Sequence, residues 1–306
     1  MEGRAFSWTY PAPSQEFIVI VLVTNDDGIY APGLAALRRA LTELGEVYLV
    51  APATEQSGVS HAITYLTPLI VKEVFHGEEQ WGWAVQGSPA DCVKIGATEI
   101  CPRMPDLVVS GINSGFNAGI NVLYSGTVAA AIEGAFYGVT SFAVSLQFDE
   151  HADYDRAADL ACRVVRQVVS QKGPDPQLYD MNIPQAALRG SPRVSTVPMD
   201  VVLHHDRFEK RYDPWGREYF WLTGSPSAST AGQKTDLTEL AAGNITLTPL
   251  DYNLTRAAVV AQMENWHFDL ESAPEQLPSA PAVSPPLMRT QRKVFPKNAE
   301  LKGIVR

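Results

Sequence analysis

Residues 17–52 read FIVIVLVTNDDGIYAPGLAALRRALTELGEVYLVAP, and this stretch decides the fold class of the chain. Residues 17–24 are continuously apolar and rich in β-branched side chains, which is typical of a strand buried on both faces. A helix is expected next, because Pro32 suits its first turn and leucines follow at helical spacing. Residues 47–51 predict a second strand. A strand, a helix and a strand in so short a stretch form a βαβ unit, which indicates a parallel sheet.

The same alternation of strands and helices continues along the chain. Helices are expected at residues 89–100, 127–137 and 155–170, and strands at 106–110, 142–146 and 179–183, the last of the core. Ser88, Pro89 and Asp91 stand where a capping box needs a cap, a first-turn proline and an acid. We interpret residues 111–126 as a loop. The repeats predict a doubly wound α/β fold with a mostly parallel sheet.

The pattern changes outside this predicted core. Residues 193–250 carry short alternating segments, including 217–222 and 245–250, which predict hairpins attached to the core. Residues 1–16 have no periodicity and contain two prolines, so we interpret them as a tail. Residues 272–286 are rich in Pro, Ala and Ser, which is typical of a linker.

Composition and charge limit the function classes. The 306 residues include 24 Lys and Arg against 34 Asp and Glu, a net charge of −10, which argues against binding to duplex nucleic acid. The longest apolar run, Phe17–Val23, is far shorter than the ~20 residues that span a bilayer, so no membrane association is expected. The three cysteines have no C-x-x-C spacing, and we expect reduced thiols in a cytoplasmic protein.

Two adjacent carboxylates, Asp26 and Asp27, directly follow the first predicted strand. Ligands of open α/β sheets bind beyond the carboxyl ends of the strands, so a site is expected here. Adjacent carboxylates repel each other unless a cation is present, which indicates a metal site. A single aspartate could instead cap the next helix or form a turn with Gly28, but the second charge would then stay unexplained.

Two further loops follow predicted strands at the same edge. Residues 51–61 supply hydroxyl groups, although by themselves they fit a plain surface loop. Residues 110–127 contain glycines, which let backbone amides approach a ligand closely. Their last three, Ser125, Gly126 and Thr127, open a helix whose free N–H groups favour an anion, unless Ser125 is simply an N-cap. Oxygen ligands beside an anion site suit metal-assisted phosphoryl chemistry.

Several common motifs are absent from the sequence. It contains neither G-x-x-x-x-G-K-[ST] nor G-x-G-x-x-G, which excludes the Walker-type nucleotide site and the ordinary dinucleotide fingerprint. H-E-x-x-H and G-x-S-x-G are absent as well, so the corresponding metalloprotease and α/β-hydrolase sites are not expected.

Seven long segments stand out when the sequence is taken as a whole: VTNDDGIYAPGL at 23–34, VAPATEQSGVSHAIT at 50–64, GSPADCVKIG at 87–96, PDLVVSGINSGFNAG and YSGTVAAAIEGAFYG within 105–138, YDMNIP at 179–184 and ITLTPLDYNLT at 245–255. In this order they resemble the SurE family of survival-protein nucleotidases. Their order and spacing agree over about 17–256, which is more than three quarters of the chain.

The resemblance implies a Rossmann-like three-layer α/β/α core with a β-hairpin extension and a C-terminal arm that is exchanged between subunits. A homodimer or homotetramer follows from it. We therefore expect an N-terminal tail over 1–16, a SurE-like nucleotidase domain over 17–256 with its hairpin within about 193–250, and a C-terminal arm over 257–306 that includes the Pro-rich linker.

The resemblance also implies an activity and its residues. The family hydrolyses nucleoside 5′- and often 3′-monophosphates with a divalent metal, and some members trim short polyphosphate. One Mg²⁺ or Mn²⁺ per subunit is expected, with Asp26 and Asp27 as catalytic residues. Carried over by motif, the metal ligands are Asp26, Asp27, Ser57 and Asn113. The phosphate and substrate pocket is then lined by Asn25, Asn117, Ser125, Gly126 and Thr127.

The sequence leaves the mechanism open. Either a water attacks phosphorus in line, activated by the metal or by one of the two aspartates, or an aspartyl-phosphate forms. A nucleotide or metal sensor that acts through its oligomer is the alternative function. A nucleotide-sugar transferase is a further rival, but the sequence has no clear D-x-D after a nucleotide domain.

Overall fold

The computed structural model describes residues 18–190, 192–201, 207–223, 232–268 and 270. The chain divides into two compact units, Met1–Leu254 and Thr255–Arg306. In the second unit the described residues form one helix, α6 (Ala257–Met263). The predicted tail and Pro-rich linker lie outside the described residues.

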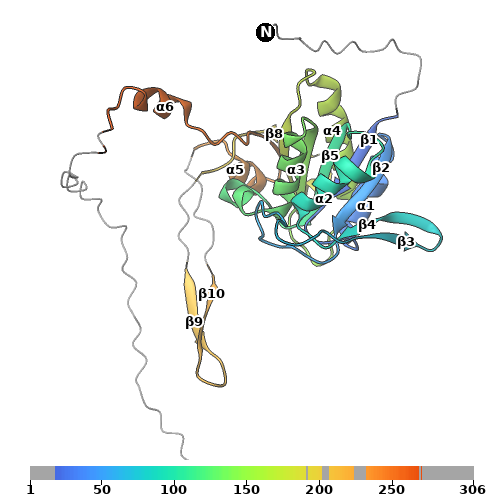
Figure 1. The fold of residues 1–306 in the computed structure, drawn as a ribbon, viewed down its shortest axis with the longest axis horizontal. Coiled ribbons are helices and arrows are strands. Elements are labelled where there is room, and N and C mark those ends of the chain that lie inside the picture. The colour runs from blue at the N-terminus through green and yellow to red at the C-terminus, as the bar shows by residue number, and fades with distance from the viewer. Residues whose placement is uncertain (1–17, 191, 202–206, 224–231, 269, 271–306) are drawn as a thin grey trace, which may run out of the picture. The chain divides into compact units, whose positions relative to one another are not determined.

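The first unit is built on a nine-stranded sheet with strand order β3-β4-β2-β1-β5-β6-β7-β11-β8 (Figure 1). Its strands are β1 (Ile20–Thr24), β2 (Glu46–Pro52), β3 (Val71–His76), β4 (Glu79–Val85), β5 (Leu107–Ser114), β6 (Thr140–Leu146), β7 (Leu178–Ile183), β8 (Val194–Thr196) and β11 (Ile245–Leu250). The six strands from β4 through β2, β1, β5 and β6 to β7 are parallel, which confirms the predicted α/β fold.

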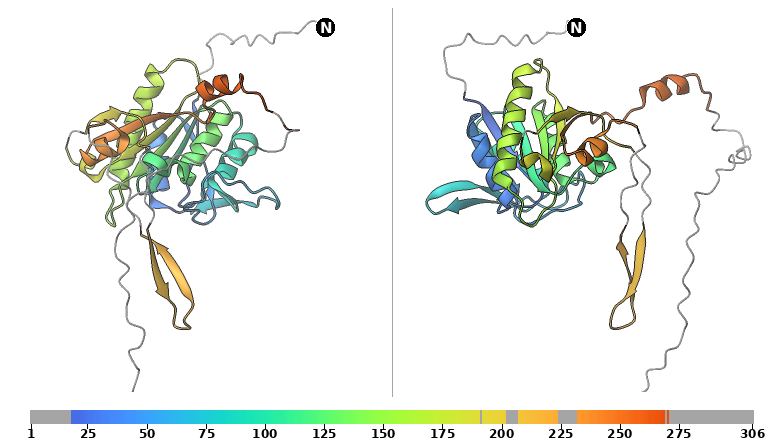
Figure 2. Two further views of the ribbon diagram at one scale, coloured as in Figure 1. Left: turned by 90° about the vertical axis from the view of Figure 1, so that its left-hand side faces the viewer. Right: turned by 180° about the vertical axis from the view of Figure 1, so that it is seen from behind.

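Helices cover both faces of the sheet and give three layers (Figures 1 and 2). One face packs against α1 (Pro32–Leu41) and α4 (Tyr154–Gln171), and the other against α2 (Pro89–Ile95) and α3 (Gly126–Phe136). In the central strand β1, alternate residues join the hydrophobic clusters of opposite faces. The strand is wholly buried, which explains its continuous apolar sequence.

The capping box predicted at the start of α2 is present, because Ser88 and Asp91 each accept the other's backbone N–H. The predicted helix 89–100 is nevertheless not one regular element. It is α-helical to Ile95 and continues as a π-helical turn, η1 (Gly96–Ile100).

The interpretation of residues 111–126 as one loop was wrong. Strand β5 continues to Ser114, and a 3₁₀ helix, η2 (Gly119–Leu123), follows. The glycines conceal the strand, yet pairing with β6 extends it through Asn113 and Ser114. Gly111 is required there, because its φ is +142° and a Cβ would lie 2.3 Å from the carbonyl oxygen of Val144.

The interpretation of 245–250 as part of a hairpin was also wrong, and 179–183 is not the last core strand. Strand β11 lies in the main sheet, antiparallel to β7 and parallel to β8. An alternating Ile-Thr-Leu-Thr pattern is typical of a strand with one solvated face, but Ile245–Thr248 are all buried. The second face is a buried polar surface, which periodicity cannot distinguish from an exposed one.

The predicted segment 217–222 does belong to a hairpin, β9 (Phe208–Tyr212) with β10 (Glu218–Leu222), which forms its own two-stranded sheet. The β3–β4 hairpin at the sheet edge was not predicted. Two short helices complete the fold, η3 (Gln185–Leu188) and α5 (Asp236–Ala241).

Within the described residues, no helix combines the length and hydrophobicity needed to cross a membrane. Cys92, Cys101 and Cys162 are buried and free of disulfides.

Candidate active site

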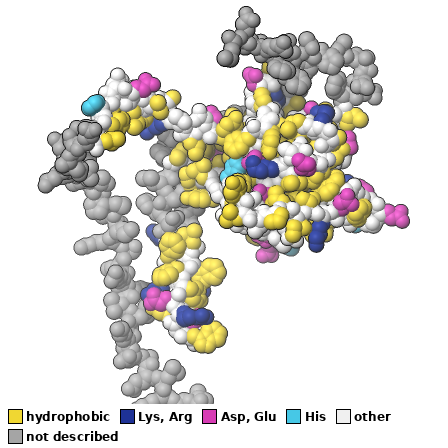
Figure 3. All heavy atoms as spheres, viewed as in Figure 1, with side chains coloured by type: hydrophobic (Ala, Val, Ile, Leu, Met, Phe, Trp, Pro, Cys, Tyr) yellow, Lys and Arg dark blue, Asp and Glu magenta, His cyan; other side chains and the backbone are white. Residues whose placement is uncertain are grey.

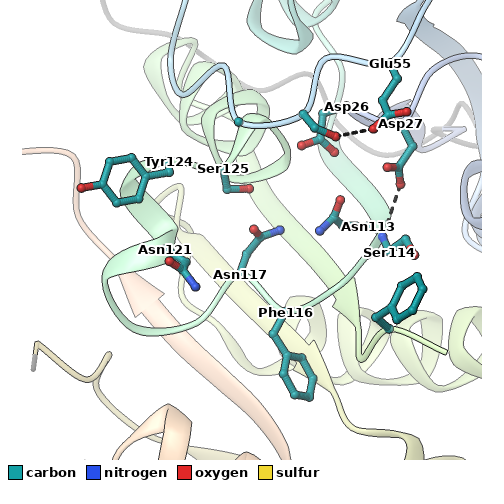
Figure 4. A pocket seen from close by; sticks show the side chains of 13 residues that line it. Asp26, Asp27, Glu55, Asn113, Ser114, Phe116, Asn117, Asn121, Tyr124 and Ser125 are labelled. Carbon is teal, nitrogen blue, oxygen red and sulfur yellow. Dashed lines mark hydrogen bonds between the residues drawn. The ribbon is translucent and has the colours of Figure 1, made fainter. Parts of the chain in front are cut away.

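A cavity of about 530 Å³ lies beyond the carboxyl ends of the central strands (Figure 4). The loops after β1, β2, β5 and β6 all reach it. Its lining residues are Asp26, Asp27, Glu55, Ser57, Gly58, Asn113, Ser114, Phe116, Asn117, Asn121, Tyr124, Ser125 and Phe148. The parallel strands thus bring together residues that are up to 122 positions apart in sequence, from Asp26 to Phe148.

The carboxylate of Asp26 is buried at the N-terminus of α3. Its Oδ2 accepts the backbone N–H of Thr127 at 3.1 Å, and its Oδ1 accepts the Thr127 hydroxyl. The positive end of the helix dipole favours a negative charge at this place. Burial raises the pKa of Asp26 above its usual value, and the two bonds from Thr127 oppose that shift.

Gly126 makes this contact possible, because it is the first residue of α3. A Cβ at this position would lie 2.9 Å from the Cβ of Asp26 and 3.1 Å from its Oδ2. Any side chain at position 126 would therefore displace the aspartate from the helix.

Two more carboxylates face the cavity. Burial, and after it the charge of Asp26, raises the pKa of Asp27 to about 6, while a bond from the Ser114 N–H to its Oδ2 (3.3 Å) opposes the shift. Glu55 accepts the Ser57 hydroxyl at 2.6 Å. Three acidic residues are therefore clustered in a cavity whose described lining contains no Lys, Arg or His.

The loop after β2, which carries Ser57, is tied down at both ends. The N–H of Gln56 donates to the Asp26 carbonyl at 2.8 Å, and the N–H of Thr64 donates to both carboxyl oxygens of Asp91 at 3.0 Å. Between them, His61 contacts the buried Glu133 at 2.9 Å. These contacts hold the loop against α2 and α3.

Amides and a hydroxyl complete the lining of the cavity. Asn113 is oriented by the bond from its Nδ2 to the Gly115 carbonyl at 2.8 Å. Ser125 is the N-cap of α3, and its Oγ accepts the Val128 N–H at 3.1 Å. An N-cap hydroxyl uses its oxygen in this way and keeps its own proton for a ligand.

The structure brings most of the predicted site residues together. Six of them line the one cavity: Asp26, Asp27, Ser57, Asn113, Asn117 and Ser125. The other three, Asn25, Gly126 and Thr127, are buried and lie outside its lining. Asn25 bonds the N–H and the carbonyl of Gly28, and Thr127 bonds Asp26. These three residues hold the site in place.

Glu55 was not predicted, although an acid close after the second strand was a signal of the same kind as Asp26 and Asp27. The tether from Asp236 was not predicted either. Its Oδ2 accepts the Gly119 N–H at 2.7 Å and so holds the loop before Ser125. No sequence pattern indicates a contact across 117 positions.

The oxygen atoms at the acidic end of the cavity are suitable ligands for a hard divalent cation. Carboxylate, hydroxyl and amide oxygens are what Mg²⁺ and Mn²⁺ prefer. Three neighbouring acids also need a positive charge to remain ionised together. Within the described residues, no group of three or more His, Cys, Asp or Glu could hold a metal by itself. The serine and asparagine oxygens would therefore have to complete the ligand set.

The bond from Thr127 to Asp26 can be tested by stability alone. We expect Thr127→Val to lower the free energy of unfolding by about 1–3 kcal/mol, because a buried carboxylate loses a donor. The matched control is Thr246→Val, since the buried Thr246 hydroxyl has no hydrogen-bond partner within the described part of the chain. Urea unfolding measures both. If the free energy of unfolding falls equally in the two variants, the bond from Thr127 to Asp26 contributes nothing specific to stability.

Comparisons with known proteins identify the family of the chain. The sequence profile of the family described as survival protein SurE matches residues 21–200. A protein named 5′-nucleotidase SurE from Rhodopirellula baltica is 53% identical over 249 residues, covering 81% of this chain and 98% of that protein. One of the same name from Syntrophobacter fumaroxidans is 40% identical and covers 81% and 99%. The crystal structure of the SurE protein from Aquifex aeolicus aligns with a TM-score of 0.71 and 33% identity, covering 80% of this chain and 98% of that one. The chain belongs to the SurE family.

Proposed function

We propose that this chain is a divalent-metal-dependent phosphomonoesterase that converts nucleoside 5′- and 3′-monophosphates to nucleoside and phosphate. The cavity is the observation that carries the proposal, because three acids and no basic residue face it from the described lining. A phosphate dianion would be repelled there unless a cation lay between. The name 5′-nucleotidase that the relatives carry supports the same activity. Short polyphosphate is a second substrate to test.

We assign the cation to Asp26, Asp27, Ser57 and Asn113, one Mg²⁺ or Mn²⁺ per subunit. When bound, it supplies Lewis-acid stabilisation to the phosphoryl oxygens. The Ser57 hydroxyl donates to Glu55, which leaves lone pairs on its oxygen for a ligand. Glu55 thereby orients the serine.

The protein's own groups bind and orient the phosphate. Asn117 and Ser125 line the same cavity as the acids, and the Ser125 hydroxyl can donate to a phosphate oxygen (Figure 4). Asp27 is the better base for an attacking water, because Thr127 occupies both oxygens of Asp26 whereas Ser114 bonds only the Oδ2 of Asp27. Its Oδ1 takes the water proton as the new P–O bond forms. The electron pair of the broken P–O bond stays on the nucleoside oxygen, which takes up a proton from solvent water.

We also propose an assembly, a location and domain limits for the protein. Every residue of β9 and β10 is exposed, and hydrophobic side chains cover much of this hairpin (Figure 3). An isolated hairpin is marginally stable, which favours its burial in a homodimer or homotetramer. The predicted exchange of C-terminal arms falls mostly outside the described residues.

The three unpaired cysteines support a cytoplasmic location. We keep 17–256 as the nucleotidase domain.

The activity can be tested by phosphate release from a panel of nucleoside 5′- and 3′-monophosphates. EDTA should abolish release, and added Mn²⁺ or Mg²⁺ should restore it.

Asp27→Asn should lower kcat by at least about a hundredfold, since it removes both the base and a charge that faces the cation. The matched control is Asp175→Asn, on the exposed loop after α4, which should be as active as the unchanged protein. Bound nucleotide that persists without release under every metal would favour the sensor.

The fit of Gly126 against Asp26 predicts a change in metal affinity. Gly126→Ala should weaken Mn²⁺ binding by about tenfold or more, because the new Cβ displaces a ligand carboxylate. Gly173→Ala is the matched control, since its Cβ would meet nothing within 4 Å. Titration calorimetry measures both. Equal affinities would contradict the placement of the cation at Asp26.

A further inference from the structure

The segment YDMNIP, residues 179–184, supplies no lining residue of the cavity. It forms most of β7, whose residues are all buried. Asn182 in this strand is fully buried and contacts the loop that carries Asn117. Its neighbour on the same face of the strand is Asp180, also fully buried.

The side-chain amide of Asn182 pairs with both backbone groups of Asn117. Its Oδ1 accepts the Asn117 N–H at 2.9 Å, and its Nδ2 donates to the Asn117 carbonyl at 3.3 Å. This is the pattern of a strand-to-strand pair, made here by a side chain beyond the end of β5. The amide can satisfy both groups in one orientation only, because a flipped amide would place donor against donor.

Asp180 selects that orientation. Its Oδ2 accepts the Asn182 Nδ2 at 2.8 Å, so the nitrogen must point towards Asp180 and the oxygen towards the Asn117 N–H. The other oxygen, Oδ1, has no hydrogen-bond partner within the described residues. Burial raises the pKa of Asp180 well above its usual value. A buried carboxyl with an unsatisfied oxygen is costly to stability, so packing alone does not explain an acid at this position.

The side chain of Asn117 is held as well. Its Nδ2 donates to the Ser145 Oγ at 2.9 Å, and Ser145 is the β6 residue paired with Asn182 across the sheet. Asn117 is only 8% exposed, yet it lines the cavity. Its backbone and its amide are therefore both fixed by buried groups of β6 and β7.

We propose that Asn182 and Asp180 are positioning residues of the active site, which hold Asn117 in the orientation that binds the phosphate. They touch neither the phosphate nor the cation, and they act through the backbone of Asn117. The inference rests on the proposed function, because Asn117 is assigned to the phosphate there. It gives the segment 179–184 a role in catalysis.

The test exchanges donors and acceptors without changing shape. Asn182→Asp places carboxylate oxygens against Asp180 and the Asn117 carbonyl, and should weaken the affinity for inorganic phosphate and lower kcat/KM by about tenfold or more. Asp180→Asn should stay close to the unchanged protein, because an amide oxygen accepts the same bond. The double variant should recover part of the loss, since the amide introduced at position 180 can donate to the carboxylate introduced at position 182, while the Asn117 carbonyl stays without its donor.

The control and the readouts separate positioning from stability. Thr248→Val changes the buried β11 residue paired with Asp180, whose hydroxyl has no partner within the described chain, and should alter neither affinity nor kcat/KM. Thermal unfolding is measured for every variant. Should Asn182→Asp fail to fold, Asn182→Ala removes the pair with the Asn117 backbone without adding a charge, and should weaken phosphate binding several-fold.

Phosphate affinity is measured by calorimetry on the Mn²⁺-loaded protein, separately from turnover. Protein that binds phosphate but releases none from nucleotides would refute the proposed function, while the affinities of the variants would still test the positioning. The proposal is overturned if Asn182→Asp, or Asn182→Ala in its place, binds phosphate as tightly as the unchanged protein. A double variant no better than Asn182→Asp would overturn it as well.

Discussion

The buried carboxylate of Asp26, bonded to the N–H and hydroxyl of Thr127, is the contact on which the site depends. It joins the end of β1, the central strand, to the start of α3. The Asp26 carbonyl also accepts the Gln56 N–H, which holds the loop after β2. Three loops are thereby brought to one point, and Gly126 allows the approach. The anion that contacts the α3 N-terminus in this structure is the Asp26 carboxylate.

Much of the fold and the main site could be predicted because their signals are local. A continuous apolar strand, a proline-started helix and Ser88 with Asp91 in a capping box each lie within a few residues. Parallel strands then place their carboxyl ends at one edge, which is why Asp26, Asp27 and Asn113 line a single cavity. The motifs of the SurE family identified the same residues.

The rest depends on contacts between distant segments. The alternation in β11 looked like a solvated strand because its threonines are polar, but that polar face is buried in the sheet. Thr127 was assigned to the phosphate from its place at a helix N-terminus, and only the packing of β1 against α3 shows that Asp26 occupies it. Asn182 and Asp236 hold the loop that carries Asn117 and Gly119, across 65 and 117 positions, and no pattern in the sequence indicates such pairs.

We propose that the acids at the end of β1 hold a divalent cation that brings the phosphate into an acidic cavity. Anomalous diffraction from crystals grown with Mn²⁺ and inorganic phosphate tests this placement most directly. We expect one manganese peak per subunit, bound by Asp26 and Asp27, with the phosphate between the metal and the wall formed by Asn117 and Ser125. A manganese peak elsewhere, or phosphate bound in the cavity without metal, would contradict it.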